Sequence, residues 1–129
     1  MRIFKTRDFA RFTRKEGIDD EALCEAIARA ERGLIDAALG GGIVKQRVPR
    51  KGQGRSGGFR TIVAYRSGDR AFFLYGFAKN ERENIEDSEL AAIKITAGLL
   101  MSMQPDMLQA ALKARKIEEV MCDGGEVQK

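Results

Sequence analysis

The pattern of apolar and polar residues predicts a β-sheet in the middle of the chain. Residues 43–48 fit a strand, because Ile43 and Val48 at its ends are apolar while Lys45 and Arg47, two residues apart, share one face. Residues 59–66 are rich in β-branched and aromatic side chains, and residues 70–78 are more apolar, which favours a central strand. A serine, a glycine and an aspartate at residues 67–69 predict a hairpin turn between these two strands. The glycine-rich segment at residues 49–58 is predicted to be a loop.

The N-terminal third predicts one short strand and two helices. Residues 2–6 fit a strand, and a helix is expected from a cap at Asp8 to about Lys15, where Gly17 ends it. A second helix is predicted over residues 20–39, before three consecutive glycines. Its apolar residues recur at helical spacing and are Leu23, Ile27, Leu34 and Ala38.

The C-terminal third predicts two more helices and a short strand. The first helix is expected to begin at Asp87 or Ser88 and to end near Met101, and the second follows from Pro105 to residue 115. A strand fits residues 117–121, and the tail at residues 123–129 is expected to fray. The pattern contains no repeat and no linker, so residues 1–129 are interpreted as a single domain.

Composition indicates a soluble protein of a reducing compartment. No apolar run approaches the roughly 20 residues that span a bilayer, so no membrane association is expected. The N-terminus is interrupted by charges every few residues, unlike a signal peptide. The two cysteines, Cys24 and Cys122, lie far apart and match no metal spacing. We interpret them as reduced core or tail residues and predict a cytoplasmic protein.

Positive charge is concentrated in the predicted sheet. Residues 43–82 hold 10 basic and 2 acidic residues, whereas residues 1–42 are neutral and residues 83–129 carry a net charge of −4. Within the block, the segment KQRVPRKGQGRSGGFR from Lys45 to Arg60 contains six basic residues and no acidic one. A rigid cationic surface suits a polyanion, and nucleic acid is the polyanion that we favour. The alternative is a solvated basic loop.

Candidate chemistry is limited because the chain contains no histidine. Catalysis would have to use Lys, Arg, Tyr, Asp or Glu, and no histidine-containing zinc site is possible. Residues 52–57 match the letters G-x-G-x-x-G, but they lead into a strand rather than a helix, so we reject a dinucleotide site. The glycines could still cradle a phosphate through backbone amides, or they could simply make a mobile loop.

Three cations form the sharpest candidate site. Lys45 and Arg47 are two residues apart and point to the same side of one predicted strand, and Arg60 begins the next. If the strands pair, these side chains could converge on one phosphate, and the alternative is a solvent-facing sheet edge. Phe59, beside Arg60, is the candidate for stacking on a base.

The central motifs resemble a known family. KGQGRSGGFRT and the strand segment YGFAKNER are similar to those of RelE/HigB-like toxins of type II toxin–antitoxin modules, and the resemblance covers about residues 1–120. It implies a small α+β domain with N-terminal helices packed on an antiparallel sheet and with helices at the C-terminus. It also implies cleavage of mRNA, often on the translating ribosome, without a metal or another cofactor. The implied protein partner is a cognate antitoxin.

The resemblance also implies a set of site residues. Lys45, Arg47 and Arg60 match catalytic cations of the family, and Lys79 matches a further one, or Arg82 if the alignment slips. Some relatives use a C-terminal tyrosine as base, but this chain has no tyrosine after Tyr75, which leaves the base open. The residues expected to bind RNA around these cations are Arg50, Lys51, Arg55, Phe59 and Arg82.

Two other functions use the same charge. A non-catalytic RNA- or ribosome-binding module needs the cations but no base. A DNA-binding regulator acting within a toxin–antitoxin complex is a weaker alternative, because no predicted helix has the exposed cationic face of a recognition helix.

Overall fold

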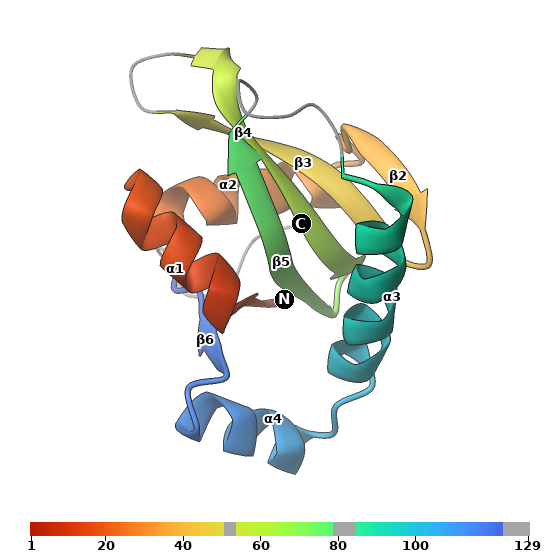
Figure 1. Ribbon diagram of the computed structural model, residues 1–129. Helices are drawn as coiled ribbons and strands as arrows, with labels where there is room; N and C mark the ends of the chain where they lie inside the picture. The colour runs from red at the N-terminus through yellow and green to blue at the C-terminus, as the bar shows by residue number, and fades with distance from the viewer. Residues whose placement is uncertain (51–53, 79–84, 123–129) are drawn as a thin grey trace.

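The protein is an α+β domain built around one mixed sheet, as the computed structural model shows (Figure 1). The structure describes residues 1–50, 54–78 and 85–122, with the side chains of residues 54–57 excepted. These residues form four helices and six strands, and the strand order in the sheet is β2-β3-β4-β5-β1-β6. The strands are β1 (Arg2–Thr6), β2 (Ala37–Gly40), β3 (Ile43–Arg50), β4 (Gly54–Arg66), β5 (Arg70–Ala78) and β6 (Ile117–Glu119). The helices are α1 (Arg7–Glu16), α2 (Asp20–Glu31), α3 (Asp87–Met101) and α4 (Pro105–Lys113).

The strands of the sheet pair antiparallel except for β1 and β5. β1 runs parallel to β5, with Phe4 opposite Phe72, and every other neighbouring pair is antiparallel. The resemblance predicts an antiparallel sheet, so the fold class is confirmed with this one parallel contact as an exception. A parallel contact requires a long crossover, and α1, α2 and the hairpins between β1 and β5 supply it.

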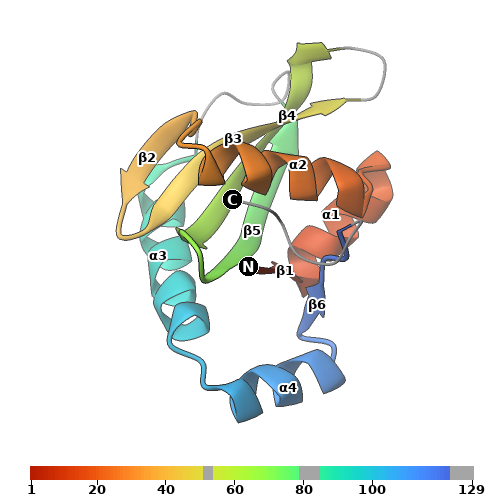
Figure 2. The same ribbon diagram turned by 180° about the vertical axis from the view of Figure 1, so that it is seen from behind.

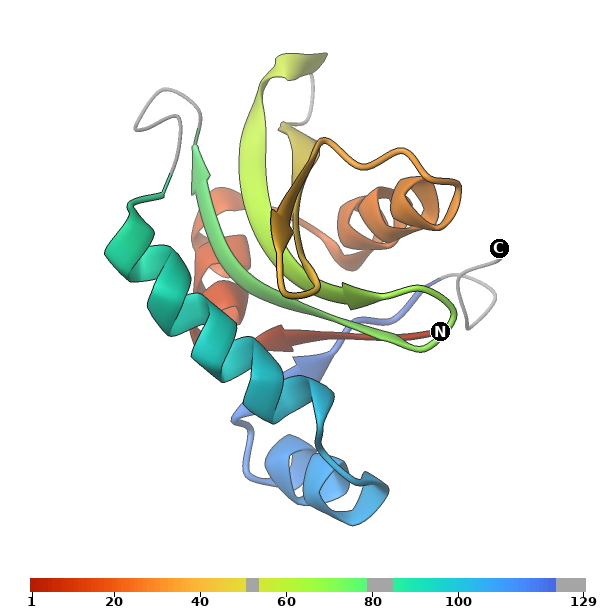
Figure 3. The same ribbon diagram turned by 90° about the vertical axis from the view of Figure 1, so that its right-hand side faces the viewer.

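Helices cover both faces of the sheet. α1 and α2 contribute Phe9, Leu23 and Ile27 to one core, and Figure 2 shows α2 lying across the sheet on this side. α3 and α4 contribute Leu100 and Leu108 to a second core on the opposite face, and Figure 3 shows α2 and α3 on opposite sides of the sheet. We call these the α1–α2 face and the α3 face. The four inner strands β3, β4, β5 and β1 divide their side chains between the two cores because successive residues point in opposite directions.

The second helix is shorter than the sequence predicts. α2 ends at Glu31, and Gly33 adopts a left-handed φ of 82°, so the predicted helix over residues 20–39 is wrong after residue 31. Leu34, expected on the apolar side of that helix, is 56% exposed. Residues 37–40 instead form β2, which pairs antiparallel with β3 and extends the sheet by one edge strand.

The two basic strands are longer than the sequence predicts. β3 continues to Arg50 and β4 begins at Gly54, where these two residues pair, so much of the predicted loop at 49–58 is strand. The strands approach closely at Gly58, where a Cβ would lie 2.5 Å from the carbonyl oxygen of Val48. A glycine interpreted as a loop residue therefore permits close strand pairing.

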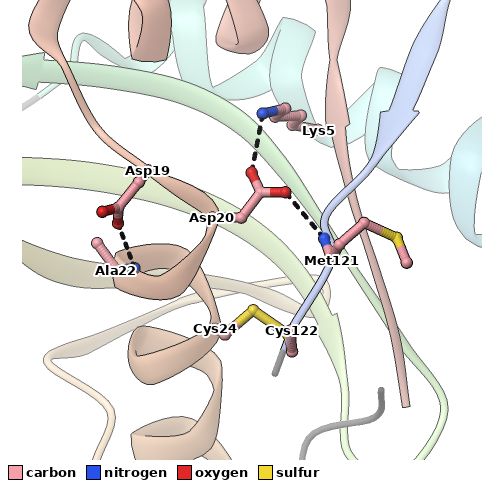
Figure 4. Close-up of a disulfide and its surroundings, with 7 residues drawn as sticks. All are labelled: Lys5, Asp19, Asp20, Ala22, Cys24, Met121 and Cys122. Carbon is pink, nitrogen blue, oxygen red and sulfur yellow. Dashed lines mark hydrogen bonds and ion pairs between the residues drawn. A yellow bond between two sulfur atoms is a disulfide. The ribbon is translucent and has the colours of Figure 1, made fainter. Parts of the chain in front are cut away.

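The cysteines form a disulfide, which corrects their interpretation as reduced core or tail residues. Cys24 in α2 and Cys122 after β6 are bonded across 98 residues of sequence, with their Cα atoms 5.8 Å apart (Figure 4). Asp20 supports the same junction, since its carboxylate accepts a hydrogen bond from the backbone N–H of Met121 at 2.9 Å and pairs with Lys5 at 3.2 Å. β6 pairs with β1, and that pairing brings the C-terminal segment to the start of α2.

Among the described residues, no helix is both long enough and apolar enough to cross a bilayer.

Candidate functional site

Strand register places three basic side chains together on the α3 face. Arg47 of β3 lies directly opposite Arg60 of β4, and Lys45 lies opposite Ile62, two residues further along β4. Directly paired residues point to the same side of a sheet, and so do residues two apart on one strand. Ile62 belongs to the core under α3, so the side chains of Lys45, Arg47 and Arg60 share that face. We call these three residues the cationic row.

Arg60 is the unusual member of the cationic row. It is only 8% exposed, and its buried Nη1 atom has no hydrogen-bond partner in the described part of the chain. Removing a guanidinium donor from water without a partner is costly, because the lost hydration is not replaced. Arg47, its direct neighbour, is partly exposed and carries the same sign of charge. The described residues therefore leave one guanidinium donor of Arg60 unused, and an anion is the kind of group that satisfies such a donor.

Two aromatic residues lie next to the cationic row on the same face. Phe77 lies opposite Arg60, and Tyr75 lies opposite Ile62, so Tyr75 is a diagonal neighbour of Arg60 on the next strand. The Tyr75 and Phe77 rings are 6.0 Å apart between centroids and tilted by 45°. Phe77 is 4% exposed, whereas Tyr75 is only partly buried. Sequence analysis gave neither residue a role, because the register that brings them beside Arg60 is not visible in the sequence.

Buried polar contacts on the opposite face fix the strands beneath the cationic row. Gln46, fully buried between Lys45 and Arg47 in sequence, donates from Nε2 to the carbonyl oxygen of Ala26 at 2.9 Å. Its Oε1 atom accepts from the backbone N–H of Asp36 at 2.9 Å. The Thr61 hydroxyl donates to the backbone carbonyl of Gln46 at 2.8 Å, which joins β4 to the same network.

The backbone of Arg47 is held directly by two charged side chains. Its N–H donates to the Asp36 carboxylate at 2.6 Å, and its carbonyl oxygen accepts from Arg29, which is itself 8% exposed and paired with Glu25. These contacts lock β3 against α2 while the Arg47 side chain points to the other face. Sites held in this way by a supporting layer are more rigid than sites on loops. The signal in the sequence was the alternation itself, which places Gln46 opposite in direction to its two cationic neighbours.

Phe59 and Arg50 do not join the cationic row. The burial of Phe59 does not fit its predicted stacking on a base, whereas RNA binding by the partly exposed Arg50 stays a prediction. Phe59 is 1% exposed on the α1–α2 face, where its ring meets the edge of Phe12 with centroids 5.6 Å apart. Arg50 lies over the Phe59 ring at 4.8 Å and pairs with Glu16 of α1 at 3.8 Å. The reason is the alternation of a strand, since Phe59 and Arg60 are adjacent and must point to opposite faces.

The remaining predicted residues lie outside what the structure describes. Lys51, Lys79 and Arg82 fall within residues 51–53 and 79–84, and the side chain of Arg55 is likewise not described. Their expected contributions to catalysis or RNA binding remain predictions from the sequence. In the described ranges, no group of three or more cysteine or acidic side chains is arranged to hold a metal ion.

A comparison with protein families supports the resemblance seen in the motifs. The family model described as the RelE toxin of the RelE / RelB toxin-antitoxin system matches residues 1–120. This range includes every strand and helix of the domain and the whole cationic row. No curated protein sequence matches the chain.

Proposed function

This chain belongs to the RelE toxin family and is a toxin of a toxin–antitoxin system, and from that premise we propose that it is a metal-independent endoribonuclease of mRNA. Its substrate is mRNA under translation at the ribosome, and its place of action is the cytoplasm. The observation that carries the proposal is the buried guanidinium nitrogen of Arg60, which has no hydrogen-bond partner among the described residues and lies beside two further cations. A phosphate oxygen is a ligand of the right charge and geometry for that donor.

The proposed reaction is an attack of a ribose 2′-oxygen on the adjacent phosphorus. The bond from phosphorus to the 5′-oxygen breaks, which yields a 2′,3′-cyclic phosphate and a 5′-hydroxyl end. One proton leaves the 2′-hydroxyl, and one is delivered to the departing 5′-oxygen. The chain therefore has to supply proton transfer and stabilise the charge that develops on the phosphorane.

The cationic row divides this work by chemistry and position. Arg60 stabilises the developing charge, because its forked donors lie in a largely buried position where electrostatic contacts are strong. Arg47, directly opposite, binds the same phosphate or its neighbour. Lys45 is the proposed proton-transfer group, and Lys79 is the proposed further substrate contact, which rests on the family resemblance alone.

The decisive test compares two identical substitutions in one strand. Arg60→Lys keeps the charge but removes the fork, and it should lower the cleavage rate at least about a hundredfold, like the loss of one preorganised oxyanion donor. Arg66→Lys is the matched control, because Arg66 lies at the far end of β4, is 58% exposed and pairs with Asp69. Purified proteins would be incubated with naked mRNA and with translating ribosomes, and new 5′ ends would be mapped.

Each outcome of that comparison has a clear meaning. Loss of cleavage with unchanged RNA or ribosome affinity in Arg60→Lys, and full activity in Arg66→Lys, supports the proposal. Equal loss of cleavage and binding in Arg60→Lys would reduce Arg60 to an ordinary surface cation. Binding by the wild-type protein without any new 5′ end would favour the non-catalytic RNA-binding module instead. Cooperative melting of both variants is the control for folding.

Membership of the family also implies a cognate antitoxin. We expect an acidic segment of that partner to cover the block at residues 43–82, which carries a net charge of +8. Induced expression of the toxin alone should arrest growth, and co-expression with the antitoxin gene beside it should restore growth. Salt should weaken the complex, because the Debye length falls from about 10 Å at 0.1 M to about 3 Å at 1 M. Failure of both flanking reading frames to rescue growth or to co-purify would contradict this partner.

A further inference from the structure

Tyr75 is placed like a residue that receives a nucleobase. It lies on β5 opposite Ile62, on the same face as the cationic row, and one diagonal step from Arg60. Diagonal neighbours on antiparallel strands have Cα atoms about 7–8 Å apart, which long and aromatic side chains can bridge. A phosphate on Arg60 would therefore place the attached nucleoside within reach of the Tyr75 ring.

The surroundings of Tyr75 make its ring a fixed surface. One part of the side chain packs in the α3-face core, where the Phe77 ring lies 6.0 Å away between centroids. The apolar side chains next to the cationic row offer little surface to a base, since Ile62 is 0% exposed and Phe77 is 4% exposed. Tyr75 is only partly buried, so part of this residue remains exposed on the face that holds the buried guanidinium.

The other residues that could stack on a base are placed elsewhere. Phe59 lies in the core of the α1–α2 face. Tyr65 is held away from the row, because its hydroxyl donates to the carboxylate of Glu31 in α2 at 2.8 Å. Burial raises the pKa of the Tyr65 hydroxyl, a hydrogen bond with Ser67 opposes that effect, and the Glu31 contact adds to it. Tyr65 is therefore a structural residue on the α1–α2 face of the sheet.

We propose that Tyr75 is a nucleobase-stacking residue, which holds the base next to the phosphate bound by Arg60. The inference rests on the proposed RNA substrate and adds the residue that orients the nucleotide around the scissile bond. Stacking accepts any base, because every base has a π face, so Tyr75 contributes affinity and orientation rather than sequence preference. Its effect on the reaction comes from placement, since a misplaced 2′-oxygen cannot attack in line.

The tyrosine content makes the test direct. The chain has two tyrosines and no tryptophan, so Tyr65→Phe leaves Tyr75 as the single source of tyrosine fluorescence. Titration at low salt with a single-stranded oligonucleotide that carries 2′-methoxy groups, and so cannot be cleaved, should quench this emission saturably. The matched control is Tyr75→Phe, in which the remaining Tyr65 should respond only to light absorbed by the oligonucleotide. An emission change that is equal in the two variants overturns the proposal.

A second pair of variants separates the ring from the hydroxyl. Tyr75→Phe keeps the ring and should retain oligonucleotide affinity and cleavage within about threefold, whereas Tyr75→Leu should lose affinity on the order of tenfold or more. Cleavage lost equally in both variants, with affinity intact, would assign the hydroxyl to proton transfer and overturn the stacking role. An unchanged affinity in Tyr75→Leu would overturn it as well. Melting curves verify the fold, and Tyr75→Phe remains informative if Tyr75→Leu is unstable.

The two proposals fail in different ways. If the wild-type protein produces no new 5′ ends but Tyr75 emission is quenched, the nuclease proposal fails and the stacking residue stands. If the wild-type protein cleaves mRNA and Tyr75 emission does not respond to the oligonucleotide, stacking fails alone.

Discussion

Loss of the disulfide should be the largest single loss of stability outside the core. Cys24 and Cys122 close a loop of 98 residues, which covers most of the 129-residue chain. The chain-entropy relation gives up to about 4.7 kcal/mol for a loop of this length. With an unfolding entropy of about 2.1 cal/mol/K per residue, that free energy corresponds to a fall in Tm of roughly 15–20 °C.

The assay is thermal melting of the wild-type protein and of three variants, with and without a reductant. Cys24→Ala, Cys122→Ala and the double variant should melt at nearly the same temperature, because breaking the bond once removes its whole effect. Reductant should lower the Tm of the wild-type protein to that value and leave the double variant unchanged. Met121→Ala is the matched control, because Met121 is 67% exposed beside the bond and should matter little.

Two results would refute this reasoning. Two titratable thiols in the folded, non-reduced protein would show that the bond is not formed. A double variant as stable as the oxidised wild-type protein would show that the bond does not constrain the unfolded chain. In a reducing compartment the protein would have the stability of the double variant, so the comparison also shows how far α1, α2 and the sheet hold the C-terminal segment without the bond.

Three further changes test packing and electrostatics in the sheet. Gly58→Ala should destabilise the protein by about 1–3 kcal/mol in urea unfolding, because the added Cβ would lie 2.5 Å from the Val48 carbonyl oxygen; a neutral effect would contradict the close pairing of β3 and β4. Gln46→Leu should cost roughly 2–4 kcal/mol in the same assay, because it leaves buried backbone partners unsatisfied; unchanged stability would mean that these partners find others. Hydrogen bonds from Arg2 hold the pKa of Glu119 below its usual value of 4.5. The stability that this pair gives the folded protein is therefore present above pH 4.5 and is lost as the pH falls through the lower pKa of the folded state. Glu119→Gln should therefore flatten the acid side of the stability profile, and an identical acid limb in both proteins would exclude this contribution.

The sequence predicted which face of a strand carries the candidate side chains better than it predicted which residues meet at the site. The spacing of Lys45 and Arg47 determined that they share a face, because a strand alternates wherever it pairs. It could not determine that Arg47 would lie opposite Arg60, since register is set by the pairing of two strands and a one-residue slip would turn every side chain over. The placement of Tyr75 near Arg60 follows from that register, and the burial of Arg60 is likewise a property of the folded chain.

The misassigned aromatic residue shows a signal that was present but not used. Phe59 and Arg60 are adjacent in a predicted strand, so the alternation already excluded both from one surface. The sequence did not show which of the two residues would point to the α1–α2 face, because that depends on where α1 packs. Tyr75 and Phe77 were equally visible as a pair on one face, but their neighbours across the sheet were not.

What the sequence by itself determined is local: the hairpin from β4 to β5, the strands rich in β-branched residues, the helix that begins at Pro105, and the side of β3 on which the cations stand. The tertiary structure decided the end of α2 at Glu31, the edge strand after it, and the bond between Cys24 and Cys122. Periodicity reports only on neighbours within a turn or a strand. Contacts between residues far apart are selected by the burial of whole faces against one another, and that selection exists only once the chain has folded.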